Sequence, residues 1–178
     1  LSSDCNLACA MCNGAFSSTI RRRREGLAPM RSPYGDEFFE QLPALLAHLH
    51  TTKFLGGEPF LAKENLRVWE LMADQPERPA CHVTTNGTVY TARVADVLAE
   101  VPMSIAVSMD GVTAPTVERI RSGADLGTIL TNLDRFQDHV ERHGTDLSLT
   151  FCLMVENWSE LPDFLVFAEQ RDLSVYVN

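Results

Sequence analysis

Apolar residues recur at intervals of three and four along five segments of the chain, which is the spacing of one face of an α-helix. These segments carry Phe38, Phe39, Leu42, Leu45, Leu46 and Leu49; Leu66, Trp69 and Met72; Val94, Val97, Leu98 and Val101; Ile129, Leu133, Phe136 and Val140; and Leu161, Phe164, Leu165 and Ala168. Short apolar runs between them predict strands over 53–55, 81–85, 104–108, 147–155 and 173–177. We expect one more strand directly before Cys5.

Pro43 falls inside the first helical segment. Proline removes a backbone donor and crowds the preceding turn of a helix. We therefore expect this helix to kink or break near Leu42.

Strands that alternate with helices of this length indicate an α/β fold. Each helix returns the chain to the same end of the sheet, so the strands should be parallel and joined by right-handed crossovers. With 178 residues, of which 45% are hydrophobic, the chain is long enough for one domain, 1–178, with a sizeable core. The loops after the carboxyl ends of the strands carry the chemistry in such folds.

Polar motifs occupy those loops. They are Cys5, Cys9 and Cys12; the GGEP sequence at 56–59; Asn86; Ser108 with Asp110; and Glu156 with Asn157. Since the carboxyl ends of parallel strands meet at one edge, we expect these motifs to lie on one face of the molecule.

Cys5, Cys9 and Cys12 form the pattern CxxxCxxC, which places three thiolates on one short loop without a fourth ligand nearby. Cysteine sulfur selects soft partners such as zinc and iron-sulfur clusters. A cubane cluster needs four ligands, so three local thiolates leave one iron open to a group that is not protein. The alternative is a zinc site made of three thiolates and one histidine, in a zinc-binding or electron-transfer module.

Cys81 and Cys152 lie alone in apolar stretches. We expect both to be buried as small hydrophobic residues, with a supplementary cluster ligand as the alternative. Five cysteines, of which three are bunched, disfavour a disulfide framework and indicate metal or redox chemistry in a reducing compartment.

The formal net charge of −9 argues against binding to a nucleic-acid backbone. Four consecutive arginines at 21–24 stand out against it, and they form either a solvated loop or a docking patch for an acidic partner. No apolar run approaches the roughly 20 residues that span a bilayer, and no signal peptide opens the chain. We expect a cytoplasmic location without a membrane partner.

Four motifs occur in order along the chain: CxxxCxxC, GGEP, TTNG at 84–87 and SMDG at 108–111. Together they resemble the core of a radical S-adenosylmethionine (radical SAM) enzyme. The resemblance implies a partial (β/α)6 TIM-like barrel and a [4Fe-4S] cluster held by the three clustered cysteines. S-adenosylmethionine (AdoMet) would chelate the fourth iron, and an external donor such as a flavodoxin or ferredoxin would supply an electron. AdoMet would then be cleaved to methionine and a 5′-deoxyadenosyl radical that takes a hydrogen atom from the substrate.

The resemblance also implies AdoMet-binding residues. Gly56 and Gly57 would let the backbone approach the methionine end of AdoMet, and Glu58 would accept a hydrogen bond from its ammonium group, whereas the alternative is an ordinary turn. Ser108 would bind the ribose hydroxyls. Asn86 either reaches the methionine or ribose portion or holds a turn with Gly87.

Arg121, on the helix after the SMDG motif, would bind the AdoMet carboxylate, with Arg119 as a competitor for that role. As alternatives, Ser108 merely ends a strand and Arg121 forms a surface salt bridge.

Other residues border the adenine and the substrate in this interpretation. Met11 stands where many family members have an aromatic residue beside the adenine, and a thioether can still cover a purine face. Met154 and Val155, at the end of the strand over 147–155, are either adenine neighbours or core residues. Asp110 and Glu156 would face the substrate, where a carboxyl group can move a proton, although no catalytic residue is assigned.

The motif set resembles most the branch of the superfamily that often carries a SPASM or twitch domain with auxiliary clusters. Members of that branch frequently modify peptides or proteins, so we expect a peptide or protein substrate, with a small metabolite of cofactor biosynthesis as the alternative. We also expect the chain to be trimmed at its N-terminus and to lack a C-terminal auxiliary domain.

Overall fold

Five parallel strands form the central sheet of the computed structural model, which describes residues 2–178. The order along the sheet is β2 (Thr51–Phe54), β3 (Ala80–Thr85), β4 (Met103–Ser108), β6 (Leu147–Phe151) and β7 (Ser174–Val177). Every neighbouring pair is parallel. The predicted α/β fold with parallel strands is therefore confirmed.

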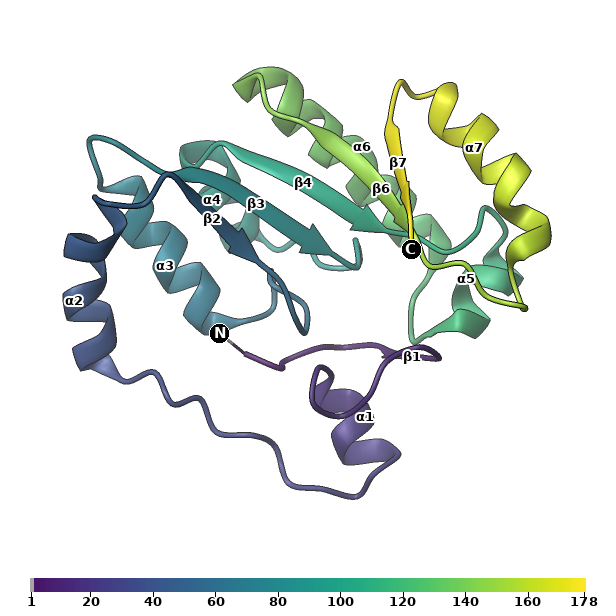
Figure 1. Ribbon diagram of the computed structural model, residues 1–178, viewed down its shortest axis with the longest axis horizontal. Coiled ribbons are helices and arrows are strands. Elements are labelled where there is room, and N and C mark those ends of the chain that lie inside the picture. The colour runs from purple at the N-terminus through teal and green to yellow at the C-terminus, as the bar shows by residue number, and fades with distance from the viewer. Residues whose placement is uncertain (1) are drawn as a thin grey trace.

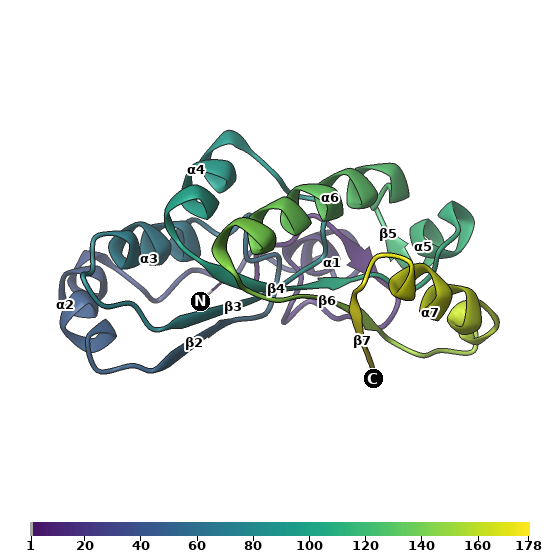
Figure 2. The same cartoon turned by 90° about the horizontal axis from the view of Figure 1, so that it is seen from above.

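Helices return the chain between these strands. They are α2 (Asp36–Leu46), α3 (Lys63–Ala73), α4 (Ala92–Glu100), α6 (Leu126–His143) and α7 (Leu161–Glu169), with the shorter α1 (Ser18–Arg23) and α5 (Ala114–Ile120) and the 3-10 helix η1 (Trp158–Glu160). Figure 2 shows α3, α4 and α6 on the same side of the sheet. None of the helices within 2–178 has the length and apolarity needed to cross a membrane.

Three local predictions need correction. Of the kink or break predicted near Leu42, the break is absent, since α2 continues through Pro43 to Leu46, and the kink stays a prediction. The strand predicted over 147–155 ends at Phe151, although the Leu153 N–H still donates to the Asn178 carbonyl beside β7.

The third error is the strand before Cys5. Residues 2–4 form no strand, because the Ser3 and Asp4 carbonyls accept hydrogen bonds from the backbone of Ser18 and Glu58 instead of a neighbouring strand. The chain has instead the two-residue strand β1 (Ala8–Cys9), which pairs antiparallel with β5 (Arg121–Ser122).

Burial alternates along the central strands. The residues that face the helices are almost fully enclosed, as Val83, Ile105 and Leu149 illustrate, whereas their neighbours on the other face are only half-buried. Parallel sheets are usually covered on both faces and their strands are apolar throughout. Here one face of the sheet is left open, and its side chains are mostly small and polar.

The N-terminal segment lies across the carboxyl ends of the strands, below the arrowheads of β2 and β3 in Figure 1. One contact brings the Asp4 carbonyl to the backbone N–H of Glu58 at 2.6 Å. Gly57 makes this approach possible: its φ is +53°, and a β-carbon there would lie 2.4 Å from the Asp4 oxygen. Gly56 also has a positive φ, +81°, but a β-carbon on it would meet only the Phe16 ring, at 4.0 Å.

Replacing Gly57 with Ala should detach the N-terminal segment from the sheet. The change adds left-handed strain and a clash with backbone, so we expect a loss of about 2–3 kcal/mol in the free energy of unfolding by urea. Gly26 is the matched control, because its φ is +65° and its position is open. Gly26→Ala should cost no more than about 1 kcal/mol, and equal costs for the two variants would refute the proposed role of the Asp4 contact.

His139 gives the core a predictable dependence on pH. It is 1% exposed and its Nε2 lies 3.2 Å from the Met103 backbone nitrogen. Burial, followed by the nearby His143, lowers the pKa of His139 from 6.5 to about 4. Below pH 6.5 the unfolded chain binds a proton that the folded chain refuses, so stability is lost as the pH falls from about 6.5 towards 4.

The wild-type chain should therefore lose about 2–3 kcal/mol more than the His139→Gln variant between pH 7 and pH 4.5 in urea unfolding. The introduced glutamine would still accept a hydrogen bond from the Met103 N–H but would not titrate. His48→Gln, at an exposed position, should leave the wild-type pH dependence unchanged. Parallel pH profiles for His139→Gln and the wild type would contradict this assignment.

Candidate functional site

Side chains from the start of α1 hold the cysteine loop by its carbonyl groups. Ser17 donates to the Leu7 oxygen at 2.7 Å, and Thr19 donates to the Cys5 oxygen at 2.7 Å. Both side chains are buried. Satisfied polar groups in a buried site fix its geometry, so this loop is rigidly placed.

Arg24 is the third anchor of the cysteine loop. Its guanidinium donates to the Cys9 carbonyl at 3.2 Å and also to the Ala8 carbonyl. The four arginines at 21–24 are therefore not one solvated run, since Arg24, although exposed like Arg22 and Arg23, binds the backbone beside a predicted cluster ligand.

The three clustered cysteines are all free thiols. Cys5 and Cys9 are buried, and Cys12 is half-buried. Burial raises the pKa of Cys5, and it raises the pKa of Cys9 to about 11, although the Arg121 guanidinium opposes the latter shift. Thiolates in this loop therefore require a cation to offset their charge, as a metal does.

Glu58 is fully buried and joins the GGEP loop to the end of β3. Its Oε1 accepts from the Phe60 N–H at 3.1 Å and the Thr85 hydroxyl at 2.7 Å, and its Oε2 accepts from the Asn86 N–H at 2.7 Å. Burial raises the pKa of Glu58, and these hydrogen bonds oppose the shift. The carboxylate is thus largely occupied by the protein, with acceptor capacity left for one further donor.

Asn86 links the end of β3 to the cysteine loop. Its amide nitrogen lies 3.1 Å from Asn6 Oδ1 and 3.9 Å from the Cys5 sulfur. Its Oδ1 accepts from the Thr88 backbone at 2.9 Å, which closes a turn. The side chain therefore holds the turn that contains Gly87, as one alternative expected, and it lies beside the cysteine loop. Its contact with AdoMet stays a prediction.

Arg121 lies at the site but not on a helix, contrary to the prediction. It caps α5, which ends at Ile120, and its backbone pairs with Cys9 between β5 and β1. Its Nε is 2.8 Å from Asp110 Oδ2, and both residues are buried. An arginine has five N–H donors in a fork, so this ion pair leaves others for a ligand.

Asp110 is fully buried. Besides the Arg121 pair, its Oδ1 accepts from the Cys152 N–H at 2.8 Å. Burial raises the pKa of Asp110, and Arg121 opposes that shift. Asp110 therefore positions Arg121 and the loop after β6.

The two remaining charged candidates lie at the surface. Arg119 donates to the Glu156 backbone oxygen at 3.1 Å, and both residues are exposed. Of the two competing arginines, Arg121 is the one that lies beside the cysteines.

The loop after β6 holds Glu156 and three other predicted residues. Met154 and Val155 belong to a turn rather than to the end of the strand, and Val155 is 87% exposed. Asn157 is fully buried and ties this turn together, with its Oδ1 accepting from the Met154 N–H at 2.7 Å and its Nδ2 donating to the Asp110 carbonyl at 3.0 Å.

Ser108 and Met11 are accessible to a ligand. Ser108 ends β4 on the open face of the sheet, half-buried, and its hydroxyl accepts from Thr150 at 3.0 Å. Met11 is 40% exposed.

The two isolated cysteines differ. Cys81 is buried in the core, as predicted. Cys152 is only half-buried and follows β6, so the prediction that it is buried was wrong.

The donor set fits a cluster by its chemistry. Iron-sulfur clusters take thiolate ligands, and three cysteines on one loop leave one iron for another group. A cubane distributes its ligands over separate iron corners. Cys5, Cys9 and Cys12, free and anchored on one loop, are the residues that would hold it.

Several solved structures share this fold, although their sequence identities are too low to show more than the fold. The enzyme anSMEcpe with bound AdoMet is 20% identical, with a TM-score of 0.69, covering 99% of this chain and 49% of that one. SuiB of Streptococcus suis bound to the precursor peptide SuiA is 13% identical, with a TM-score of 0.72, covering 99% and 37%. A radical SAM methyltransferase of Sphaerobacter thermophilus is 20% identical, with a TM-score of 0.56, covering 98% and 52%.

The chain thus spans about half or less of the length of these structures. The similarity confirms the predicted partial barrel. No curated protein sequence matches the chain significantly. The family model of the radical SAM superfamily matches residues 1–168, and the cofactors of that family are a [4Fe-4S] cluster and AdoMet. On the strength of that match and of the site geometry, this chain belongs to the radical SAM superfamily.

Proposed function

We propose that this chain is the catalytic core of a radical SAM enzyme that modifies a peptide or protein side chain. The observation that carries the proposal is the junction between the cysteine loop, the GGEP loop and the end of β3, made by Glu58 and Asn86. When bound, the cluster and AdoMet supply a 5′-deoxyadenosyl radical, which removes a hydrogen atom from the substrate.

The residues of the chain have distinct tasks in this function. Cys5, Cys9 and Cys12 hold the cluster. The free donors of the Arg121 fork bind the carboxylate of AdoMet, while Asp110 keeps the guanidinium in place. Burial of this pair excludes water, which strengthens the interaction with an anionic group.

The remaining AdoMet contacts come from the strand ends. Gly56, whose open position and positive φ leave its backbone accessible, faces the methionine end, and Ser108 binds the ribose. Glu58 holds both neighbouring loops and uses its remaining acceptor capacity for the ammonium group. Met11, Met154 and Val155 are the apolar residues available to the adenine.

A peptide substrate is supported by two observations. The sheet has an open, polar face, which suits an extended substrate better than an enclosed metabolite. SuiB and anSMEcpe have also been solved with peptides bound, namely SuiA and the Cp18Cys peptide. We further propose, from the resemblance of the motif set, that the enzyme is of the SPASM or twitch type. A cytoplasmic location and a flavodoxin or ferredoxin as electron donor are part of the same proposal.

Replacing Cys9 with Ala should abolish cluster assembly and AdoMet cleavage, because a ligand is lost from a site with only three. The measurements are the iron and sulfide content after anaerobic reconstitution and the 5′-deoxyadenosine formed with dithionite as reductant. Cys81→Ala is the matched control, since it removes a core cysteine and should retain the cluster. A full cluster in Cys9→Ala would disprove the ligand assignment, and bound zinc without cleavage by the wild type would support the zinc module.

Replacing Glu58 with Gln should leave the cluster intact but weaken AdoMet binding by about tenfold, because the new amide presents a donor where the carboxylate accepted from the backbone. Equilibrium binding of AdoMet to the reconstituted protein gives the affinity. Glu40→Gln, at an exposed position on α2, should bind AdoMet as the wild type does. An unchanged affinity of Glu58→Gln would show that the junction does not serve AdoMet.

A further inference from the structure

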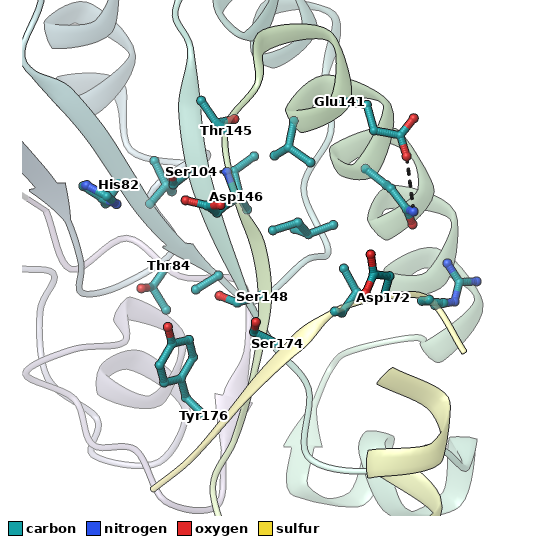
Figure 3. Close-up of a pocket in the computed structure, with 18 of the residues that line it drawn as sticks. His82, Thr84, Ser104, Glu141, Thr145, Asp146, Ser148, Asp172, Ser174 and Tyr176 are labelled. Carbon is teal, nitrogen blue, oxygen red and sulfur yellow. Dashed lines mark hydrogen bonds between the residues drawn. The ribbon is translucent and has the colours of Figure 1, made fainter. Parts of the chain in front are cut away.

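The open face of the sheet carries a groove that the AdoMet site does not use. It adjoins two cavities of about 830 and 670 Å³, which share His82 and Thr84, and the larger one extends past the sheet to Glu141 of α6 and to the loops before β6 and β7. Figure 3 shows His82 and Thr84 with Ser104, Ser148 and Tyr176, which come from β3, β4, β6 and β7. The groove thus crosses the strands, as an extended chain laid over the sheet would.

Lys53 and His82 place positive charge and donors at one end of this groove. They are direct partners in the register of β2 and β3, so they lie on adjacent strands and the same face. The smaller cavity is lined by these two residues with Thr51, Leu55 and Thr84, and none of them is acidic.

The side-chain donors at the Lys53 end of the groove form no hydrogen bonds with other described residues of the protein. Within 2–178, neither Lys53 nor His82 nor Thr84 makes a side-chain hydrogen bond, and no ion pair involves Lys53. A chain with 24 acidic and 15 basic residues has ample carboxylates to pair with a lysine. A lysine that instead faces an open groove is available to a ligand.

A carboxylate matches this set of groups. It only accepts hydrogen bonds and has about four lone-pair positions, which Lys53, His82 and the hydroxyls of Thr84 and Ser104 can fill. The larger cavity carries charges of both signs, since Glu141, Asp146, Asp172 and Arg171 line it, and Figure 3 shows Asp146 beside Ser104. No acidic residue lines the smaller cavity, so an acidic ligand group is favoured there, at Lys53.

We propose that Lys53 and His82 form a specificity site for an acidic side chain, Asp or Glu, of the peptide substrate. The inference rests on the proposed peptide substrate and adds a sequence requirement to it. Against a net charge of −9, which repels acidic peptides elsewhere, such a site gives selectivity by local attraction.

Ligand binding at Lys53 can be followed directly, because the sequence has only two lysines, Lys53 and Lys63. Reductive ¹³C-methylation keeps the lysine charge and gives each side chain its own NMR signal. The reconstituted protein is titrated with two acetylated and amidated heptapeptide pools, which are randomised at six positions and differ only in a central Glu or Gln.

The Glu pool should shift the Lys53 signal and leave the Lys63 signal in place, with an affinity about fivefold higher than that of the Gln pool. Lys53→Gln should remove this preference, whereas Lys63→Gln, on the exposed start of α3, should retain it. A third pool, with central Gln and a free C-terminal carboxylate, tests for recognition of a chain end.

Equal affinities for the Glu and Gln pools, equal shifts of both lysines, or a Lys53 shift only with the free carboxyl terminus would overturn the inference. AdoMet cleavage is measured on the same preparation without peptide. Cleavage with no Glu preference refutes the specificity site alone, while a Glu preference without cleavage refutes the proposed enzyme and leaves the binding site standing.

Discussion

The site depends on one buried carboxylate. Glu58 accepts hydrogen bonds from the GGEP loop and from two consecutive residues at the end of β3, so it sets the spacing between two strand ends. The neighbouring peptide group binds Asp4, which brings the cysteine loop to the same place. Hydrogen bonds to a buried charged group contribute about 1.5–3 kcal/mol each, so this junction is strong enough to fix segments that have little core of their own.

Side chains of both charges surround the cysteine loop and have opposite effects on the ionisation of its thiols. Arg24 and Arg121 approach it from α1 and β5, and Glu58 and Asp110 are buried close by. The cations favour thiolates, whereas burial and the carboxylates disfavour them, and the net result is a raised pKa for Cys5 and Cys9. The thiols of such a loop lose their protons more readily when an iron centre binds than when the site is empty. Protonation of the cysteines is therefore coupled to metal binding.

The sequence predicted the parts of the structure that depend on local pattern. Helical periodicity located α3, α4 and α6, and the motifs after the strands identified the residues that meet at one edge of the sheet. Contacts between distant segments were beyond its reach: the pairing of Cys9 with Arg121, the burial of Asp110 and the anchoring by Arg24 each join residues that no spacing rule connects. The position of Asn157 after a strand marked it as a candidate in the sequence. Its structural role became clear only from its buried hydrogen bonds.

The alternation of large apolar residues with small or polar ones along the strands also indicates which face of the sheet is covered. A parallel strand enclosed on both faces reads as a continuous apolar run, whereas β4 and β6 alternate large apolar residues with Ser, Ala and Thr. One face of the sheet therefore has no apolar layer packed against it. The hydrophobic core lies on the face covered by helices, where Trp69, Phe60 and Phe136 pack. The open polar face beside the cysteine loop is the surface on which the proposed peptide substrate would lie.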